Sequence, residues 1–134
     1  MKKILLLTIV MVSLIMPESG TLMADVPSPT VPAFYSEMGV ASFYSYECAK
    51  LPMANGKPFD PEKRTCASWF YKFGTRLVVK SLDTGRSTEV VVTDRGPNKR
   101  LVKEGRIIDL SKRAFQDISA LEKGLTRVVV TVKN

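Results

Sequence analysis

The chain has 134 residues, with 20 Lys and Arg against 13 Asp and Glu, a formal net charge of +7, two Cys and no His. That length accommodates one domain with its own hydrophobic core. Without His the chain has no Ser-His-Asp or Cys-His nucleophile system, and two Cys cannot build a four-thiolate metal site. Any chemistry must rest on carboxylates, hydroxyls, Lys, Arg or backbone groups, so we expect no metal and no cofactor.

Residues 1–24 have the pattern of a secretory signal peptide. Lys2 and Lys3 precede an apolar run from Ile4 to Met16, and Pro17 ends it. In a helix this run reaches only about 20 Å, which is short of a hydrocarbon core about 30 Å thick. We therefore predict cleavage after Ala24 and export to the periplasm or the extracellular cell envelope, with no stable membrane span afterwards. A retained N-terminal anchor is the alternative.

The next segment, residues 25–38, is rich in Pro and predicts an extended linker, with one folded domain over residues 39–134. The excess of positive charge suits an anionic surface such as a cell envelope, and it also serves solubility. Because the basic residues are scattered along the chain, we expect no nucleic-acid partner. We expect the exported protein to be a monomer.

Short β-rich runs separated by turn residues dominate the domain. The expected strands are Val40 to Tyr44, Thr75 to Leu82, Ser87 to Thr93, Ile107 to Leu110 and Arg127 to Val132. Asp83-Thr84-Gly85 is a hairpin signal between the second and third of these runs. Ser111 is the expected N-cap of a short helix that buries Ala114, Phe115 and Ile118. Strands this short, with one or two short helices, predict a mainly β fold, a small closed β-barrel.

Cys48 and Cys66 lie 18 positions apart in the predicted domain. In an exported protein, an even pair at this spacing favours one disulfide. Two reduced and buried thiols are the alternative.

Three stretches combine polar side chains with turn residues: Gly39 to Tyr44, Met53 to Asp60, and Val92 to Pro97. In the last of them a hydrophobic strand runs directly into Asp94 and Arg95. A carboxylate at a strand end is held by the sheet yet faces the rim, which suits a general acid. The alternative is an Asp that accepts backbone N–H bonds from the turn that follows it.

These motifs resemble the rare lipoprotein A (RlpA) family over roughly residues 39–132. The matching pieces are Gly39 to Tyr44, Asn55-Gly56 with Phe59-Asp60, Gly74-Thr75, Asp94-Arg95-Gly96-Pro97 and Gly105 to Ser111. The resemblance implies a six-stranded double-psi β-barrel, related to that of expansins. It also implies a lytic transglycosylase that cleaves peptidoglycan glycan strands between N-acetylmuramic acid and N-acetylglucosamine, leaving 1,6-anhydro ends.

The resemblance also assigns residues. Asp94 matches the main catalytic aspartate, and Asp60 matches a second catalytic acid of the groove. Tyr44 lies in the strand that lines the same cleft and is assigned to substrate binding. Arg95 is placed with the substrate-binding residues. Asp109 is the competing acid, but its position just before Ser111 suits a structural carboxylate that anchors the start of the helix.

Two positions depart from the family pattern. Lys57 stands where the family usually has Glu, and Ser68 stands where it usually has His. We assign both to substrate binding, with Lys57 placed to bind the lactyl carboxylate of muramic acid. Cys48 and Cys66 lie outside the pattern and bracket the altered loop. These departures also favour a second hypothesis, an expansin-like module that binds peptidoglycan or polysaccharide without cutting it.

Overall fold

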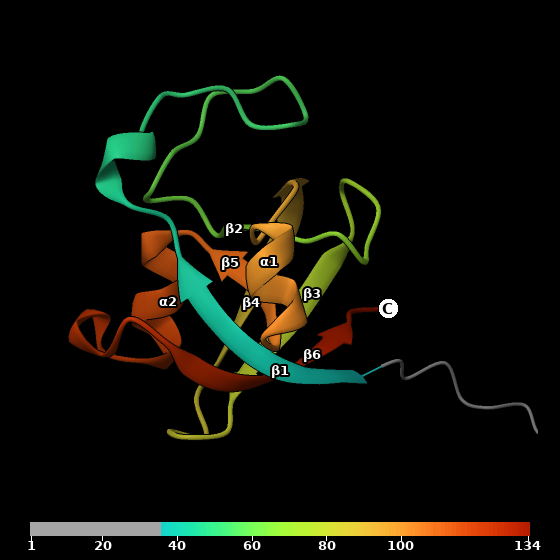
Figure 1. Cartoon of the computed structure of the whole chain (residues 1–134), viewed down its shortest axis with the longest axis vertical. Helices are drawn as coiled ribbons and strands as arrows, with labels where there is room; N and C mark the ends of the chain where they lie inside the picture. The colour runs from blue at the N-terminus through green and yellow to red at the C-terminus, as the bar shows by residue number, and fades with distance from the viewer. Residues whose placement is uncertain (1–35) are drawn as a thin grey trace, which may run out of the picture. The chain divides into compact units, whose positions relative to one another are not determined.

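A closed barrel forms the centre of the computed structural model, which describes residues 36–134 (Figure 1). Its strands are β1 (Ser36–Phe43), β2 (Thr65–Ala67), β3 (Arg76–Ser81), β4 (Ser87–Asp94), β5 (Arg106–Leu110) and β6 (Thr126–Val132). They follow the order β1-β5-β2-β4-β3-β6 around the barrel. The pairs β1/β5 and β2/β4 are parallel, and the other pairs are antiparallel. The predicted mainly β, six-stranded barrel is confirmed.

The predicted signal peptide, residues 1–24, lies outside the described residues, as does most of the predicted linker. β1 begins at Ser36, three residues before the predicted start of the domain at Gly39. Over residues 36–134, every helix is too short to cross a membrane.

The barrel is filled by alternate residues of its strands. Along β3, Leu77 and Val79 are buried, whereas the residues next to them are more exposed. Val90 and Val92 are buried in the same alternation along β4. Successive side chains of a strand point to opposite faces, so a two-residue hydrophobic period places one face in the core. Phe115, fully buried, packs beneath Phe43 with ring centroids 4.7 Å apart.

The helix that follows β5 matches its prediction. α2 (Lys112–Ile118) begins after Ser111, whose Oγ accepts a hydrogen bond from the backbone N–H of Ala114 at 3.2 Å. Ala114, Phe115 and Ile118 are its buried residues. A second helix, α1 (Lys99–Lys103), has Asn98 as N-cap, and two 3-10 turns, η1 (Tyr46–Cys48) and η2 (Leu121–Lys123), complete the helical part.

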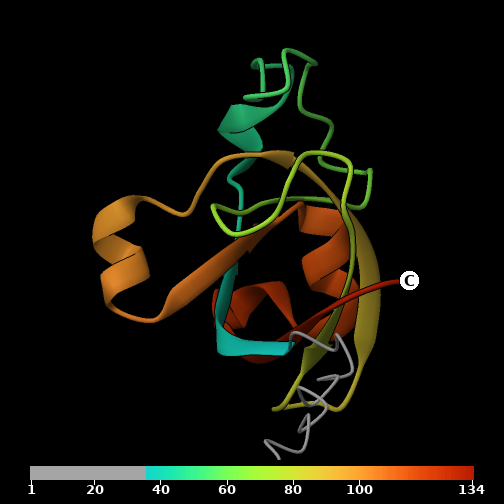
Figure 2. The same cartoon turned by 90° about the vertical axis from the view of Figure 1, so that its right-hand side faces the viewer.

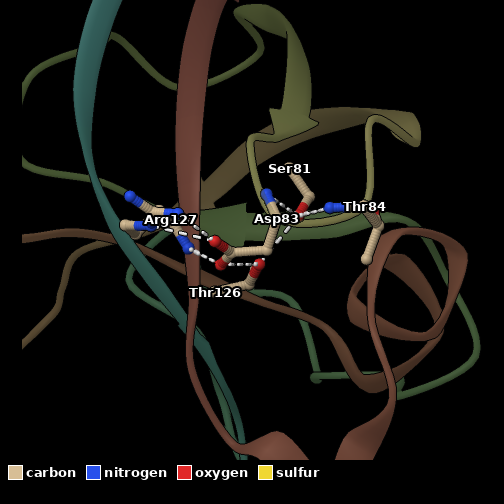
Figure 3. A network of polar contacts seen from close by, with 5 residues as sticks. All are labelled: Ser81, Asp83, Thr84, Thr126 and Arg127. Atoms are coloured by element: carbon tan, nitrogen blue, oxygen red, sulfur yellow. Dashed lines mark hydrogen bonds and ion pairs between the residues drawn. The ribbon is translucent and has the colours of Figure 1, made fainter.

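The predicted hairpin between β3 and β4 lies at the end of the barrel opposite the loop of residues 45–60 (Figures 1 and 2). Figure 3 shows how its turn is fastened to β6. The Asp83 carboxylate accepts hydrogen bonds from Nε and Nη2 of Arg127 at 2.9 and 2.7 Å and from the hydroxyl of Thr126 at 3.1 Å. The hydroxyls of Thr126 and Ser81 are 2.8 Å apart. This network joins the hairpin turn to the start of β6, at the end of the barrel opposite the loop of residues 45–60.

The two cysteines correct a prediction, because both are free thiols rather than a disulfide. Cys66 lies on β2 between Val92 of β4 and Leu110 of β5, and its side chain is fully buried in the core. Cys48 lies in η1, in the loop above the barrel, and is partly exposed. The alternation of side chains along β2 directs Cys66 into the barrel. The structure therefore agrees with the alternative expectation of two reduced thiols.

We expect the two thiols to differ in reactivity. Burial, and secondarily the charge of Asp109, raises the pKa of Cys66, which suppresses the nucleophilic thiolate. An aromatic disulfide reagent such as Ellman's should therefore modify Cys48 in the native protein and both cysteines only after unfolding without reductant. Cys48→Ser should abolish the native reaction. Unfolded, unreduced protein without free thiols would show a disulfide instead.

Candidate active site

Asp94 is the last residue of β4, and its carboxylate is held by three hydrogen-bond donors. The Tyr44 hydroxyl donates to Oδ2 at 2.7 Å, while the backbone N–H groups of Ala54 and Arg95 each donate to Oδ1 at 2.8 Å. These donors come from the end of β1, from the loop above the barrel and from the turn after β4. Asp94 thus lies at the end of its strand, where we expected a general acid. It also accepts a hydrogen bond from the backbone N–H of Arg95 in the following turn, as the alternative interpretation expected.

The phenol of Tyr44 serves Asp94 only as a donor. Burial raises the pKa of Tyr44 far above its usual range, and the hydrogen bond and charge of Asp94 raise it further. The hydroxyl is therefore protonated at every physiological pH. The ring packs against Phe59 with centroids 4.8 Å apart, so the loop carrying Phe59 also positions Tyr44.

Asp109 is the second carboxylate of this rim. Ala67 of β2 is the register partner of Asp94 on one side and of Asp109 on the other. The two acidic residues are therefore two strand spacings apart, roughly 10 Å between backbones. The Asp109 carboxylate accepts a hydrogen bond from the Ser42 hydroxyl on β1, whereas the start of α2 is capped by Ser111. Its hydrogen bond thus connects β5 to β1 rather than to the helix that we expected it to anchor.

The electrostatics of Asp109 favour its protonated form. Burial raises the pKa of Asp109 and outweighs the hydrogen bond from Ser42 and the charge of Arg106, which lower it; the charge of Asp94 is the smallest effect and raises it further. Gly96 packs against this carboxylate, because a Cβ at that position would lie 3.4 Å from Oδ2 of Asp109. The turn after Asp94 therefore covers Asp109 and keeps water from part of it.

Asp94 opens onto a pocket of about 140 Å³ beneath the loop above the barrel. Its walls include Tyr44, Cys48, Met53 and Phe59. Met53 is fixed there by the Thr93 hydroxyl, 3.2 Å from its sulfur.

Asp60 and Lys57 lie beside this pocket rather than in it. Both line a depression of about 310 Å³, and Asp60 also lines one of about 390 Å³ with Lys50 and Lys63. Asp60 is exposed, and its Oδ1 accepts the backbone N–H of Glu62 at 2.9 Å. The structure thus places Asp60 in the neighbourhood of Asp94 without a direct contact between the two acids.

Ser68 and Arg95, which we assigned to substrate binding, make their hydrogen bonds within the protein. Ser68 is fully buried, and its hydroxyl accepts the backbone N–H of Phe70 at 3.1 Å. Arg95 donates from Nη1 to the carbonyl oxygens of Ser68 and Tyr71 at 2.7 and 2.8 Å. The Ser68 side chain therefore holds the start of the loop that follows β2, and the Arg95 side chain fastens this loop to the end of β4.

Sequence reasoning missed Ser42 and Ala54 as partners of the two acids. They lie 67 and 40 positions away from Asp109 and Asp94, respectively, so no local pattern marks them. Over residues 36–134, no group of three or more His, Cys, Asp or Glu side chains is arranged to hold a metal ion.

Comparisons with known proteins agree with this geometry. A family model described as lytic transglycolase matches residues 36–130. The probable endolytic peptidoglycan transglycosylase RlpA of a Nostoc species is 39% identical over 99 residues, covering 72% of this chain and 26% of the relative. The endolytic peptidoglycan transglycosylase RlpA of Vibrio cholerae is 34% identical over 101 residues, covering 75% of this chain and 37% of the relative. The match thus spans only 26% to 37% of the length of these relatives.

Solved structures share the fold. The Streptomyces papain inhibitor superposes with a TM-score of 0.58 at 23% identity, covering 74% of this chain and 94% of the inhibitor. An expansin of Clavibacter michiganensis superposes with a TM-score of 0.57 at 20% identity, covering 74% of this chain and 50% of the expansin. These likenesses establish the double-psi type of barrel.

The raised pKa of Asp109 predicts how Asp109→Asn changes stability with pH. The protonated carboxyl contributes fully below its unfolded pKa of about 3.9, and this contribution is lost as the pH rises through the higher folded-state pKa. Asn retains an oxygen that can accept the Ser42 hydrogen bond and does not ionise. Thermal melts from about pH 3 to pH 8 should therefore show the variant gaining stability over the wild type as pH rises.

Glu122→Gln, which removes a charge from an exposed side chain of η2, serves as the control. A difference between Asp109→Asn and the wild type that stays constant with pH would contradict the buried-acid description.

Proposed function

This chain belongs to the lytic transglycolase family of the RlpA proteins, and from that membership we propose that its barrel cleaves the glycan strands of peptidoglycan. The products would carry 1,6-anhydro-N-acetylmuramic acid ends. The observation that carries the proposal is the Asp94 carboxylate, which is held by three donors and lines a pocket at the end of β4. The reaction needs one well-placed acid and no water nucleophile, which suits a site with few polar groups.

Asp94 would serve first as acid and then as base. Its Oδ1 is occupied by two backbone N–H groups, so the transferable proton belongs on Oδ2, the oxygen next to Tyr44. That proton passes to the glycosidic oxygen as the bond to C1 of the muramic acid breaks. The C6 hydroxyl of the same sugar then bonds to C1 and gives its proton to the Asp94 carboxylate, which restores the acid. Tyr44 would hold Oδ2 in place throughout.

Lysines beside the pocket favour an anionic substrate. Lys57 is exposed and lines the depression next to Asp94's pocket, and Lys50 and Lys63 flank the larger one. We assign Lys57 to the lactyl carboxylate of muramic acid. Asp60 lines both depressions with these lysines and would bind sugar hydroxyls as the second acid of the groove.

A second candidate function is binding without cleavage, as in an expansin-like module. Two observations favour it: Ser68, at the family's His position, is fully buried, and Asp60 makes no direct contact with Asp94. Mass spectrometry of peptide-free glycan strands after incubation separates the two functions. Anhydro-ended fragments support cleavage, whereas bound but intact strands support the binding module.

The place of action follows from residues 1–24. We propose that this segment directs export and that the barrel acts in the cell envelope. N-terminal sequencing of the exported protein should begin near Asp25, and a start at Met1 would contradict export.

Asp94→Asn should abolish cleavage while the fold persists. The amide keeps the shape of the side chain but cannot exchange a proton, and general acid–base catalysis contributes about 10²- to 10⁴-fold. Anhydro-ended product should therefore fall by this factor in a timed digest, with an unchanged circular dichroism spectrum. If Asp94→Asn cleaves fully while a folded Asp109→Asn is inactive, the roles of the two acids are reversed.

Lys57→Gln should weaken binding of strands that carry free lactyl carboxylates. An exposed ion pair is worth little, so we expect an increase of about 2- to 5-fold in KM with kcat retained. Strands with methyl-esterified carboxylates should bind both proteins equally. Lys80→Gln, on an exposed residue of β3, is the matched control, and an equal effect there would show that only net charge matters.

A further inference from the structure

The loop after β2 exposes three large aromatic side chains within five residues. Trp69 is 43% exposed, Phe70 48% and Phe73 43%. Half-exposed aromatic rings gathered in one loop are unusual on a soluble surface and indicate contact with a ligand. The proposed reaction at Asp94 uses none of them.

The loop is held rigidly against the end of β4. The indole N–H of Trp69 donates to the carbonyl of Pro97 at 2.6 Å, and the N–H of Gly74 donates to the carbonyl of Val92 at 2.8 Å. The two bonds from Arg95 to Ser68 and Tyr71 fasten its middle. A loop backbone and an indole ring held in this way lose little conformational freedom when a ligand binds.

Cations accompany the rings. The Arg95 guanidinium carbon lies 3.9 Å from the centroid of Phe73, and the Lys99 ammonium lies 5.0 Å from that of Trp69. Lys72, in the same loop, is exposed. A surface that interleaves aromatic rings with cations suits a ligand that has both apolar faces and negative charges.

The loop is also continuous with the candidate active site. The backbone N–H of Ser68 donates to the carbonyl oxygen of Asp94 at 3.1 Å, and Trp69 is bonded to the turn that begins at Asp94. In Figure 1 the loop lies at the same end of the barrel as the tip of β4. A glycan strand with one glycosidic linkage at Asp94 therefore extends toward the aromatic loop or toward the lysine-lined depressions.

We propose that Trp69, Phe70 and Phe73 form a stacking surface for sugar rings of the glycan strand, next to the position that is cut. The inference rests on the proposed function and adds a binding subsite to it. The C–H face of a pyranose buries apolar area against an aromatic ring. The carboxylates of muramic acid would pair with the ammonium groups of Lys72 and Lys99 beside the rings. A purely apolar partner would leave these cations without counter-charges.

Trp69 reports on the subsite directly, because it is the single Trp of the chain. Asp94→Asn protein titrated with peptide-free glycan strands should show a saturable blue shift of tryptophan emission. Phe70→Ala in the same background removes a ring that is about half exposed, so its fold should persist. Its Kd for the strands should rise about 3- to 10-fold. Leu82→Ala, 43% exposed in the hairpin turn at the opposite end, should leave Kd unchanged.

The subsite is overturned if strands bind by calorimetry without any change in emission and with equal Kd for the Phe70 and Leu82 variants. An emission shift caused only by vesicles of anionic phosphatidylglycerol would also overturn it, in favour of a membrane contact. Mass spectrometry of wild-type digests tests the function separately. Anhydro-ended products without an emission response retain cleavage and reject the subsite, whereas an emission response without products retains the subsite and rejects cleavage.

Discussion

The hydrogen bonds to the Asp94 carboxylate are the interaction on which the upper half of the molecule depends. Tyr44, Ala54 and Arg95 come from three segments that are distant along the chain, and this one side chain joins them at the end of β4. The long loop above the barrel has little regular structure of its own, and its position is set by such contacts. A charged or ionisable acceptor with several donors is a strong local constraint, since removing it leaves donors without partners.

Small residues make the two-acid arrangement possible. β2 has only three residues, yet its Ala67 lies between Asp94 and Asp109 in register. Gly96 brings the backbone of the next turn against both Ala67 and Asp109, so closely that a Cβ there would lie 3.2 Å from the Cβ of Ala67. A short strand with a methyl side chain thus sets the spacing of the carboxylates. The barrel supplies this spacing through strand pairing, so it does not depend on loop conformation.

Burying Asp109 is unfavourable for stability at neutral pH, because its raised pKa means that ionisation is penalised in the folded state. The lower end of the barrel shows the opposite arrangement. There the hydrogen bonds from Arg127 lower the pKa of Asp83, an exposed carboxylate that closes the hairpin. Carboxylates whose pKa is raised by burial gather at functional sites, although structural ion pairs such as that of Asp83 shift pKa values too. The buried Asp109 in register with Asp94 thus adds to the proposal that the chemistry takes place at the rim where both lie.

Much of the barrel follows from local patterns in the sequence. The two-residue period of Val and Leu in β3, β4 and β6, the turn at Gly85 and the Ser111 cap each involve residues that are neighbours along the chain. The position of Asp94 at a strand end is likewise predicted by the hydrophobic run that precedes it. Only the tertiary structure revealed four other features: strand β2, helix α1, the free thiol of Cys66 and the burial of Ser68. These features depend on pairings such as Ser42 with Asp109, 67 positions apart, whose partners are chosen by packing of the closed barrel and leave no local signal.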